Sequence, residues 1–254
     1  MDYLIRLVKA LIPEQYHPTL GEIHRICRSF LFIGNRYICP CCGWRFRTLL
    51  PYGNKKRPNV GCPRCNSAER HRLLWLYLKN KTNLFSDNLK ILHFAPEYIF
   101  QKTLRFMPNL DYISADLNSP MAMVKMDITN ILYEDNTFDV ILCSHVLEHV
   151  IDDRKAMREL FRVLKPSGWG ILQVPILRDK TFEDPSIVSP EDRERIFGQK
   201  DHVRIYGRDY KDRLEEEGFI VKVDGYVREL GGDKIKKHGL SEDQDIYFCT
   251  KQRP

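Results

Sequence analysis

The stretch that decides the fold is residues 138–175, FDVILCSHVLEHVIDDRKAMRELFRVLKPSGWGILQVP. It opens with a nearly continuous apolar run at 138–144, as a strand buried on both faces requires. An amphipathic helix at 152–164 follows, and a second apolar strand at 168–176 comes after it. A strand, a helix and a strand in this order predict part of a parallel sheet.

The same alternation of strands and helices continues on both sides of this stretch. The expected strands lie at residues 89–95, 111–117, 124–128, 138–144, 168–176, 219–227 and 245–251. The expected helices lie at residues 97–106, 152–164 and 210–217, the last closed by Gly218. This pattern predicts an α/β fold, in which helices cover both faces of a mainly parallel, doubly wound sheet. We assign this seven-stranded domain to residues 81–254.

A long connection at residues 177–206 interrupts the alternation. Connections of this length are uncommon in compact domains and often carry function. Within it, Ser189 and Pro190 are typical of a helix cap and a first helical residue. We therefore expect a partly helical insertion on the substrate side of the domain.

Four of the eight cysteines lie ahead of this domain in two CxxC pairs. Cys39 and Cys42 form one pair, Cys62 and Cys65 the other, with the spacing C-x2-C-x19-C-x2-C. Each CxxC turn presents two sulfurs to one metal, and two turns complete a tetrahedron, so we predict a zinc ribbon. The protein would fill all four ligand positions, which makes Zn²⁺ structural. Cys41, inside the first turn, should point away from the metal.

The cysteine-rich region also interleaves basic and aromatic residues, Arg45 and Trp44 among them. Such a mixture is typical of RNA binding. The alternative is a ribbon that uses its aromatic rings for packing and only stabilises the fold. We assign residues 36–80 to the ribbon with its linking helix, and residues 1–35 to an N-terminal helical segment.

Composition favours a folded protein without a membrane span. Hydrophobic residues make up 43% of the chain, and the formal net charge is +6, which permits an anionic partner without requiring one. No run approaches the roughly 18 apolar residues that a span needs. Residues 1–12 carry an apolar stripe with basic flanks, which fits either packing on the protein or peripheral contact with a membrane. Without an export signal, we expect a cytoplasmic location.

The candidate cofactor residues lie at the ends of four of the predicted strands. They are His93, Phe94, Ala95 and Glu97 at the first strand, Asp116 and Leu117 at the second, Asp127 and Ile128 at the third, and Ser144 and His145 at the fourth. In open α/β sheets, ligands bind beyond the carboxyl ends of the strands. An acid about twenty residues after the first strand accepts hydrogen bonds from ribose hydroxyls, and Asp116 has this position. These residues therefore predict a nucleoside-cofactor site.

The pattern LEHV…D…RVLKP.G within residues 147–168 makes the prediction more specific. It resembles class I S-adenosylmethionine-dependent methyltransferases of the type 11 group. The resemblance covers roughly residues 89–250, and it implies a Rossmann-like methyltransferase sheet with S-adenosylmethionine as cofactor. The combination of CPxCG…CPRC with ERHRLLWLYL and LHFAPE is similar to a bacterial subgroup with an N-terminal zinc ribbon.

The resemblance also implies roles for the residues at the strand ends. His93, Ala95 and Glu97 stand at the family's acidic, glycine-rich first motif, Asp116 at the ribose, Asp127 and Ile128 at the adenine, and Ser144 and His145 at the methionine end. This chain has Ala95 and Pro96 where the family has glycines. Glycine lets the backbone approach a cofactor and proline lacks an N–H, so a non-catalytic S-adenosylmethionine-binding protein is one alternative function.

Methyl transfer is an in-line displacement that depends on positioning and, for hydroxyl or amine acceptors, on a general base. His145 and His202 are the candidate catalytic bases, and Arg204 is a candidate for binding an anionic acceptor. We expect a small-molecule, sugar-like or glycan acceptor beneath the insertion. The alternative enzyme is an RNA methyltransferase that uses the ribbon to recognise RNA.

Overall fold

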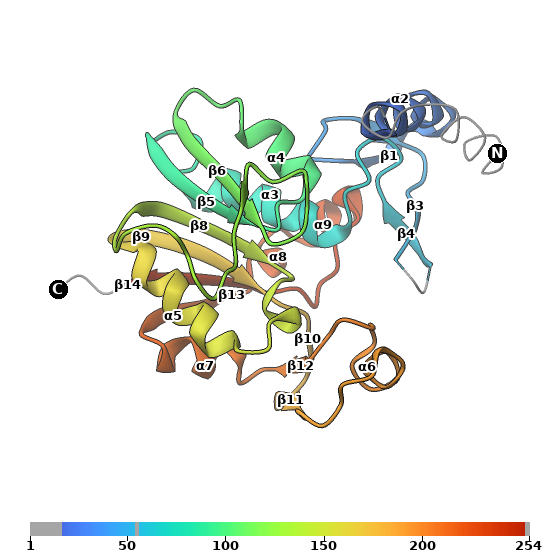
Figure 1. Cartoon of the computed structure of the whole chain (residues 1–254). Coiled ribbons are helices and arrows are strands. Elements are labelled where there is room, and N and C mark those ends of the chain that lie inside the picture. Colours follow the sequence, from blue (N-terminus) through green and yellow to red (C-terminus); the bar gives the residue numbers. More distant parts are fainter. Residues whose placement is uncertain (1–16, 54–55, 252–254) are drawn as a thin grey trace. The chain divides into compact units, whose positions relative to one another are not determined.

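The structure, a computed structural model, describes residues 17–53 and 56–251 (Figure 1). The chain divides into two compact units. The first, here called the ribbon unit, comprises residues 1–81 and 227–244, and the second, the sheet unit, comprises residues 82–226 and 245–254. The helix expected at residues 1–12 lies outside the described residues. Within the described ranges, no helix combines the length and apolar character needed to cross a bilayer.

Seven strands form the central sheet of the sheet unit, in the order β13-β14-β9-β8-β5-β6-β7. They are β5 (Leu89–Phe94), β6 (Leu110–Asp116), β7 (Val124–Lys125), β8 (Phe138–Ser144), β9 (Leu164–Gln173), β13 (Phe219–Asp224) and β14 (Ile246–Lys251). All seven predicted strands are present, and helices flank the sheet (Figure 1). The predicted fold class is confirmed.

The strand order reverses next to β5. This strand pairs in parallel with β6 on one side and with β8 on the other, and Phe94 lies opposite Cys143 near the carboxyl ends. Crossover connections leave in opposite directions at such a point, so a crevice opens beyond the strand ends. Only β14 breaks the parallel pattern among the central strands, because it is antiparallel to both β9 and β13.

Local sequence accounts for these elements. In β8 every side chain is buried except Asp139, which is half-buried. The Asp139 carboxylate accepts hydrogen bonds from the Lys90 backbone N–H at 2.9 Å and from Lys165 Nζ at 2.8 Å, so the one charged residue of the strand is satisfied. Gly218, at φ 100°, follows helix α7 (Tyr210–Glu216) as predicted, since this backbone conformation favours glycine.

Two helices cover one part of the sheet side by side, α5 (Asp153–Val163) and α7 (Figure 1). Arg154 of α5 donates a hydrogen bond to the Arg213 carbonyl of α7 at 2.8 Å. Of the apolar face expected on this helix, Met157 and Leu164 lie in the main core and Phe161 packs against it; Leu160 of α5 joins the core as well. A shorter helix, α4 (Tyr98–Leu104), follows β5.

The insertion between β9 and α7 has more structure than the sequence predicted. It contains β10 (Ile176–Arg178), β11 (Phe182–Glu183), α6 (Pro190–Phe197) and β12 (Arg204–Gly207). The three strands form their own sheet in the order β10-β12-β11. Ser189 caps α6 as expected, because its Oγ accepts a hydrogen bond from the Asp192 N–H at 3.1 Å.

The ribbon unit is built from short strands and helices. They are α2 (His17–Ser29), η2 (Phe30–Phe32), β1 (Ile33–Ile38), β2 (Arg45–Phe46), β3 (Leu50–Tyr52), β4 (Arg57–Gly61), α3 (Glu69–Lys81) and α9 (Gly232–His238), with α8 (Tyr226–Glu229) at the junction of the units. β1 pairs with β2 and β3 with β4, both antiparallel. Two short hairpins followed by a helix are compatible with a zinc-ribbon module and a linking helix.

The two compact units differ from the predicted domain boundaries in one segment, residues 227–244. Residues 227–244 were assigned to the sheet-forming domain, but they pack in the ribbon unit. Arg72, fully buried on α3, donates to the carbonyls of His238 and Gly239, both at 2.6 Å. The same guanidinium donates to the carbonyls of Val60 at 2.8 Å and Ser67 at 2.6 Å. One buried cation thus joins α3, the ribbon and the segment after α9.

Replacing Arg72 with methionine should destabilise the ribbon unit by about 3 kcal/mol, because buried carbonyls lose a charged donor. Hydrogen exchange of the amides in residues 57–81, followed by mass spectrometry, measures the loss locally. Arg45→Met, at an exposed position of β2, is the matched control and should change stability by less than about 0.5 kcal/mol. Equal exchange in both variants would contradict the role given to Arg72.

Candidate functional site

A cavity of about 810 Å³ opens at the carboxyl ends of β5, β6 and β8. Its volume falls in the range of small-molecule sites. The predicted residues that line it are Phe94, Ala95, Asp116, Leu117, Asp127, Ile128 and His145. The structure therefore brings together residues from four separate strand ends, as the strand-end rule anticipated.

Three predicted cofactor residues do not line this cavity. The buried His93 ring lies between two partners, with Nδ1 2.8 Å from the Tyr112 hydroxyl and Nε2 2.9 Å from a Glu97 carboxylate oxygen. Ser144 is buried as the last residue of β8. His93 and Glu97 therefore support the backbone of the first loop from behind, and His145 takes the place at the cavity that Ser144 was expected to share.

Two residues that line the cavity adopt the left-handed backbone conformation, Ala95 at φ 44° and His145 at φ 57°. Each follows directly on a strand, β5 or β8. A side chain in this conformation costs roughly 1–2 kcal/mol relative to glycine. Ala95 thus adopts the left-handed backbone conformation that glycine adopts more easily, and the tight turn after β5 forms without a glycine.

Two aspartates that line the cavity, Asp116 and Asp127, accept hydrogen bonds from residues two or three positions later in the chain. Asp116 Oδ1 accepts hydrogen bonds from the backbone N–H groups of Asn118 and Ser119, both at 2.7 Å. Asp127 Oδ1 accepts from Thr129 N–H at 2.8 Å and from the Thr129 hydroxyl at 2.9 Å. These bonds hold both carboxylates in place at the cavity wall.

A histidine and carboxylate cluster lies at one side of the cavity. His145 Nδ1 is 3.2 Å from Glu148 Oε1, and His149 Nδ1 is 3.2 Å from Asp201 Oδ2. The rings of His149 and His202 meet edge to face, with centroids 4.6 Å apart. His202 does not line the cavity; it lies behind His149, and burial, followed by the charge of His149, lowers its pKa.

Three further residues line the cavity: His149, Asp201 and Arg193. His149 follows the fourth predicted strand on the side expected for the cofactor, at the end of a short turn, η3 (Leu147–His149). Arg193 was not expected from the sequence. Asp201 and Arg193 come from the insertion, whose path the sequence does not determine.

Arg204 has a different position from the one predicted. It is 3% exposed and donates to the carbonyls of Leu147 and Ile151, both at 2.8 Å, and to that of Val150. It also lies 2.8 Å from Glu183. A guanidinium with these partners cannot bind an acceptor, so the prediction for Arg204 is wrong. Its role is to fasten the segment that carries His149 to β12.

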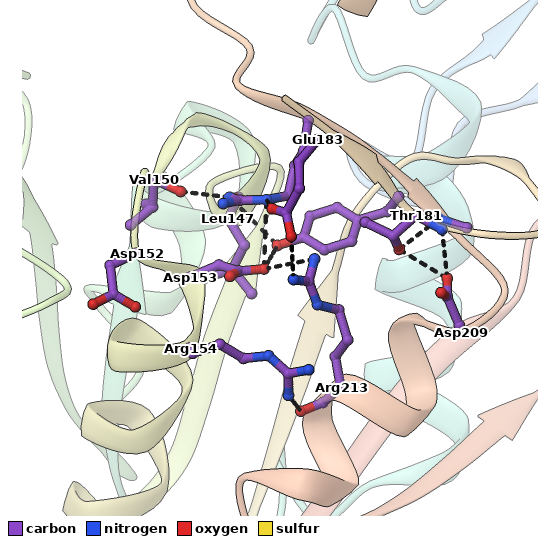
Figure 2. A network of polar contacts seen from close by, with 12 residues as sticks. Leu147, Val150, Asp152, Asp153, Arg154, Thr181, Glu183, Asp209 and Arg213 are labelled. Carbon is purple, nitrogen blue, oxygen red and sulfur yellow. Dashed lines mark hydrogen bonds and ion pairs between the residues drawn. The ribbon is translucent and has the colours of Figure 1, made fainter. Parts of the chain in front are cut away.

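Two arginines, Arg204 and Arg213, lie beside two carboxylates, those of Asp153 and Glu183. Figure 2 shows Arg213 facing both carboxylates. Arg213 is 2.6 Å from Glu183 and 3.4 Å from Asp153. Burial opposes ionisation of Glu183, but hydrogen bonds from Arg213 and Arg204 outweigh it and lower its pKa. The insertion is therefore held by a charge-balanced network.

In the ribbon unit, the four predicted cysteines converge. The thiol sulfurs of Cys39, Cys42, Cys62 and Cys65 all lie within 4.8 Å of one another. Cys39 and Cys65 are 3.6 Å apart, and Cys42 and Cys62 are 3.7 Å apart. Four sulfurs about 2.3 Å from a zinc ion in a tetrahedron would be about 3.8 Å apart, so the cluster is compatible with zinc. The Cys41 thiol instead contacts the His71 carbonyl at 3.6 Å, as expected for a spare thiol.

Comparison with known proteins shows which families and structures this chain is similar to. Residues 106–172 match a family model described as a methyltransferase domain. The structure is similar to that of the YcgJ protein from Bacillus subtilis, with a TM-score of 0.50 and 16% identity, covering 72% of this chain and 100% of that one. At this identity the likeness shows the fold alone. The sheet unit has the methyltransferase fold.

Curated proteins similar to parts of this chain carry names from quinone biosynthesis. The ubiquinone/menaquinone biosynthesis C-methyltransferase UbiE of Klebsiella pneumoniae (strain 342) is 24% identical over 146 residues, 55% of this chain and 52% of that protein. A demethylmenaquinone methyltransferase of Corynebacterium urealyticum is 35% identical over 60 residues, 24% of this chain and 26% of that protein. The chain thus spans about half the length of these relatives or less. The comparisons therefore show a matched stretch of methyltransferase domain and a methyltransferase-like fold.

Replacing Ala95 with glycine should stabilise the methyltransferase unit by about 1 kcal/mol, because glycine adopts φ 44° without strain. Thermal unfolding should show a raised midpoint. The matched control is Ala156→Gly in α5, which removes a buried methyl group from a regular helix and should lower the midpoint. A lowered midpoint for Ala95→Gly would show that the turn carries no strain.

Proposed function

We propose that this protein transfers the methyl group of S-adenosylmethionine to a small-molecule acceptor with an aromatic, quinone-like ring. The observation that carries the proposal is the single cavity at the strand reversal, which gathers Ala95, Asp116, Asp127 and His145. Residues from four strand ends meet there in the order that a nucleoside cofactor requires.

In this proposal the cofactor lies along the strand ends. The tight turn at Ala95 brings the backbone close to the cofactor, and Asp116 accepts hydrogen bonds from the ribose hydroxyls. Asp127 and Ile128 contact the adenine. The Asp116 carboxylate is already held by two backbone N–H groups, so it is oriented before the ligand arrives.

The acceptor would occupy the side of the cavity formed by the segment after β8 and by the insertion. Val146, Val150 and Ile151 give this side an apolar surface, and Arg193 adds one cation. That mixture suits a ring with ionisable oxygens, and the names of the relatives favour a quinone. His145, oriented by Glu148, is the candidate general base.

We also propose that the ribbon holds one structural zinc ion through Cys39, Cys42, Cys62 and Cys65. The spacing of their sulfurs supports it. A divalent cation would stabilise all four thiolates and, with no ligand position left for water, would serve folding alone.

Asp116→Ala should weaken S-adenosylmethionine binding about tenfold or more, because two ribose hydroxyls lose a charged acceptor. Isothermal calorimetry measures the affinity, and transfer of a labelled methyl group to a panel of demethylated quinols and sugars measures turnover. The control is Asp111→Ala, on the same strand at its other end, which should bind like the unchanged protein.

Two outcomes would contradict this function. No binding of S-adenosylmethionine by the unchanged protein would exclude the cofactor. Binding without turnover on any acceptor of the panel would favour a non-catalytic binding protein.

Cys62→Ser should release the zinc ion and expose the ribbon unit, since metal binding supplies folding free energy in such modules. Metal analysis of the purified protein should fall from one zinc per chain to none, and the amides of residues 36–66 should lose exchange protection. Cys41→Ser, inside the same cysteine turn, should keep the metal. Full zinc content in the Cys62 variant would refute the ligand assignment.

A further inference from the structure

Three side chains next to the cavity form a cluster that could hold a metal ion: Glu148, His149 and His202. One ligand atom from each lies within 4.8 Å of the others. Glu148 and His149 belong to η3, and His202 comes from the insertion, more than fifty residues later. Two imidazoles and a carboxylate are a recurring ligand set for zinc and for iron, cobalt or manganese.

Two buried atoms of the cluster have no hydrogen-bond partner. They are Glu148 Oε2 and His202 Nε2, on residues that are 1% and 6% exposed. An unpaired buried polar atom costs roughly 1–3 kcal/mol, and such atoms are rare in folded proteins. Both occur in the same cluster, where one cation would satisfy them together.

The other carboxylate oxygen of Glu148 and one ring nitrogen of His149 have partners of their own. Glu148 Oε1 faces His145 Nδ1 at 3.2 Å, and His149 Nδ1 faces Asp201 at 3.2 Å. Glu148 and His149 are thus each oriented through one atom, as metal ligands with outer partners are.

The protein holds the two sources of ligands together before any ion binds. The Val203 N–H donates to the Glu148 carbonyl at 2.9 Å. The buried Arg204 binds the carbonyls on both sides of His149, at Leu147 and Val150. Ligands around an ion at about 2.1 Å lie about 3.0–3.4 Å apart, so small side-chain rotations complete the site.

We propose that Glu148, His149 and His202 bind one divalent transition-metal ion through Glu148 Oε2 and one ring nitrogen of each histidine. Three protein ligands leave at least one coordination position open. His149, His145 and Asp201 line the cofactor cavity, so the open position faces it. Resting on the proposed function, the ion would bind an acceptor oxygen and lower the pKa of its hydroxyl.

Cobalt(II) titration tests the site on the full-length protein carrying one zinc per chain, so that the ribbon is filled. We expect one further Co²⁺ to bind, with visible d–d bands and without the charge-transfer band of a thiolate site. His202→Gln and His149→Gln should each weaken Co²⁺ binding about 100-fold or more. Asp201→Asn, which removes an outer partner, should weaken it about 10- to 100-fold.

His24→Gln is the matched control, because it removes a histidine of α2 that lies outside the cluster. It should leave Co²⁺ affinity unchanged. His149 is about one-third exposed (32%), so its variant keeps the test valid if the buried His202 variant does not fold. Absence of a second metal, a thiolate spectrum, or equal affinity in a folded His149→Gln variant would overturn the proposal.

Calorimetry with S-adenosylmethionine on the same preparations separates the two hypotheses. Co²⁺ binding without binding of S-adenosylmethionine would support the metal site and contradict the proposed function. Binding of S-adenosylmethionine with no second metal would do the reverse.

Discussion

The parallel pairing of β5 with β8 is the constraint on which the site depends. The chain leaves β5 toward β6 and returns to β8 on the opposite side, so nothing closes over the two carboxyl ends. Ala95 and His145 follow these ends directly and turn at once into the left-handed conformation. Backbone strain at two adjacent strand ends is typical of sites where a ligand approaches the main chain closely.

The second constraint is the buried guanidinium of Arg204. A charge removed from water is tolerated only when its hydrogen bonds are made, and Arg204 makes them to three carbonyls and to Glu183. The consequence is geometric: the insertion becomes a fixed wall, and His202 is held against His149.

The elements of the sheet could be predicted because their signals are local. A run such as residues 138–144 is apolar at nearly every position, and only a doubly covered strand buries it. The residues at the cavity could be predicted for a related reason: the strand-end rule requires only the order of strands. It placed Asp116, Asp127 and His145 at the cavity wall, whereas the buried Ser144 does not line it.

The remaining features depend on contacts between residues far apart in the chain. Arg72 finds carbonyls 166 and 167 residues away, and nothing near Gly239 in the sequence marks it as a partner. Arg204 was misread because an arginine beside a site is equally consistent with ligand binding and with burial, and only the packed structure decides between them. Likewise, only the structure shows that Glu148 Oε2 and His202 Nε2 are buried without a hydrogen-bond partner.

The two candidate metal sites differ in the number of coordination positions that the protein fills, and this gives them different roles. Four thiolates fill a tetrahedron, exclude water and leave an ion with a purely structural role. Two imidazoles and a carboxylate leave coordination positions open, and the outer partners His145 and Asp201 lie on the cavity wall. The first site is built from hairpin turns close together in sequence, whereas the second needs the insertion to be folded against η3. A cation at the second site would therefore bind only when the insertion is folded against η3. Folding of the insertion would in this way be coupled to metal binding beside the cavity.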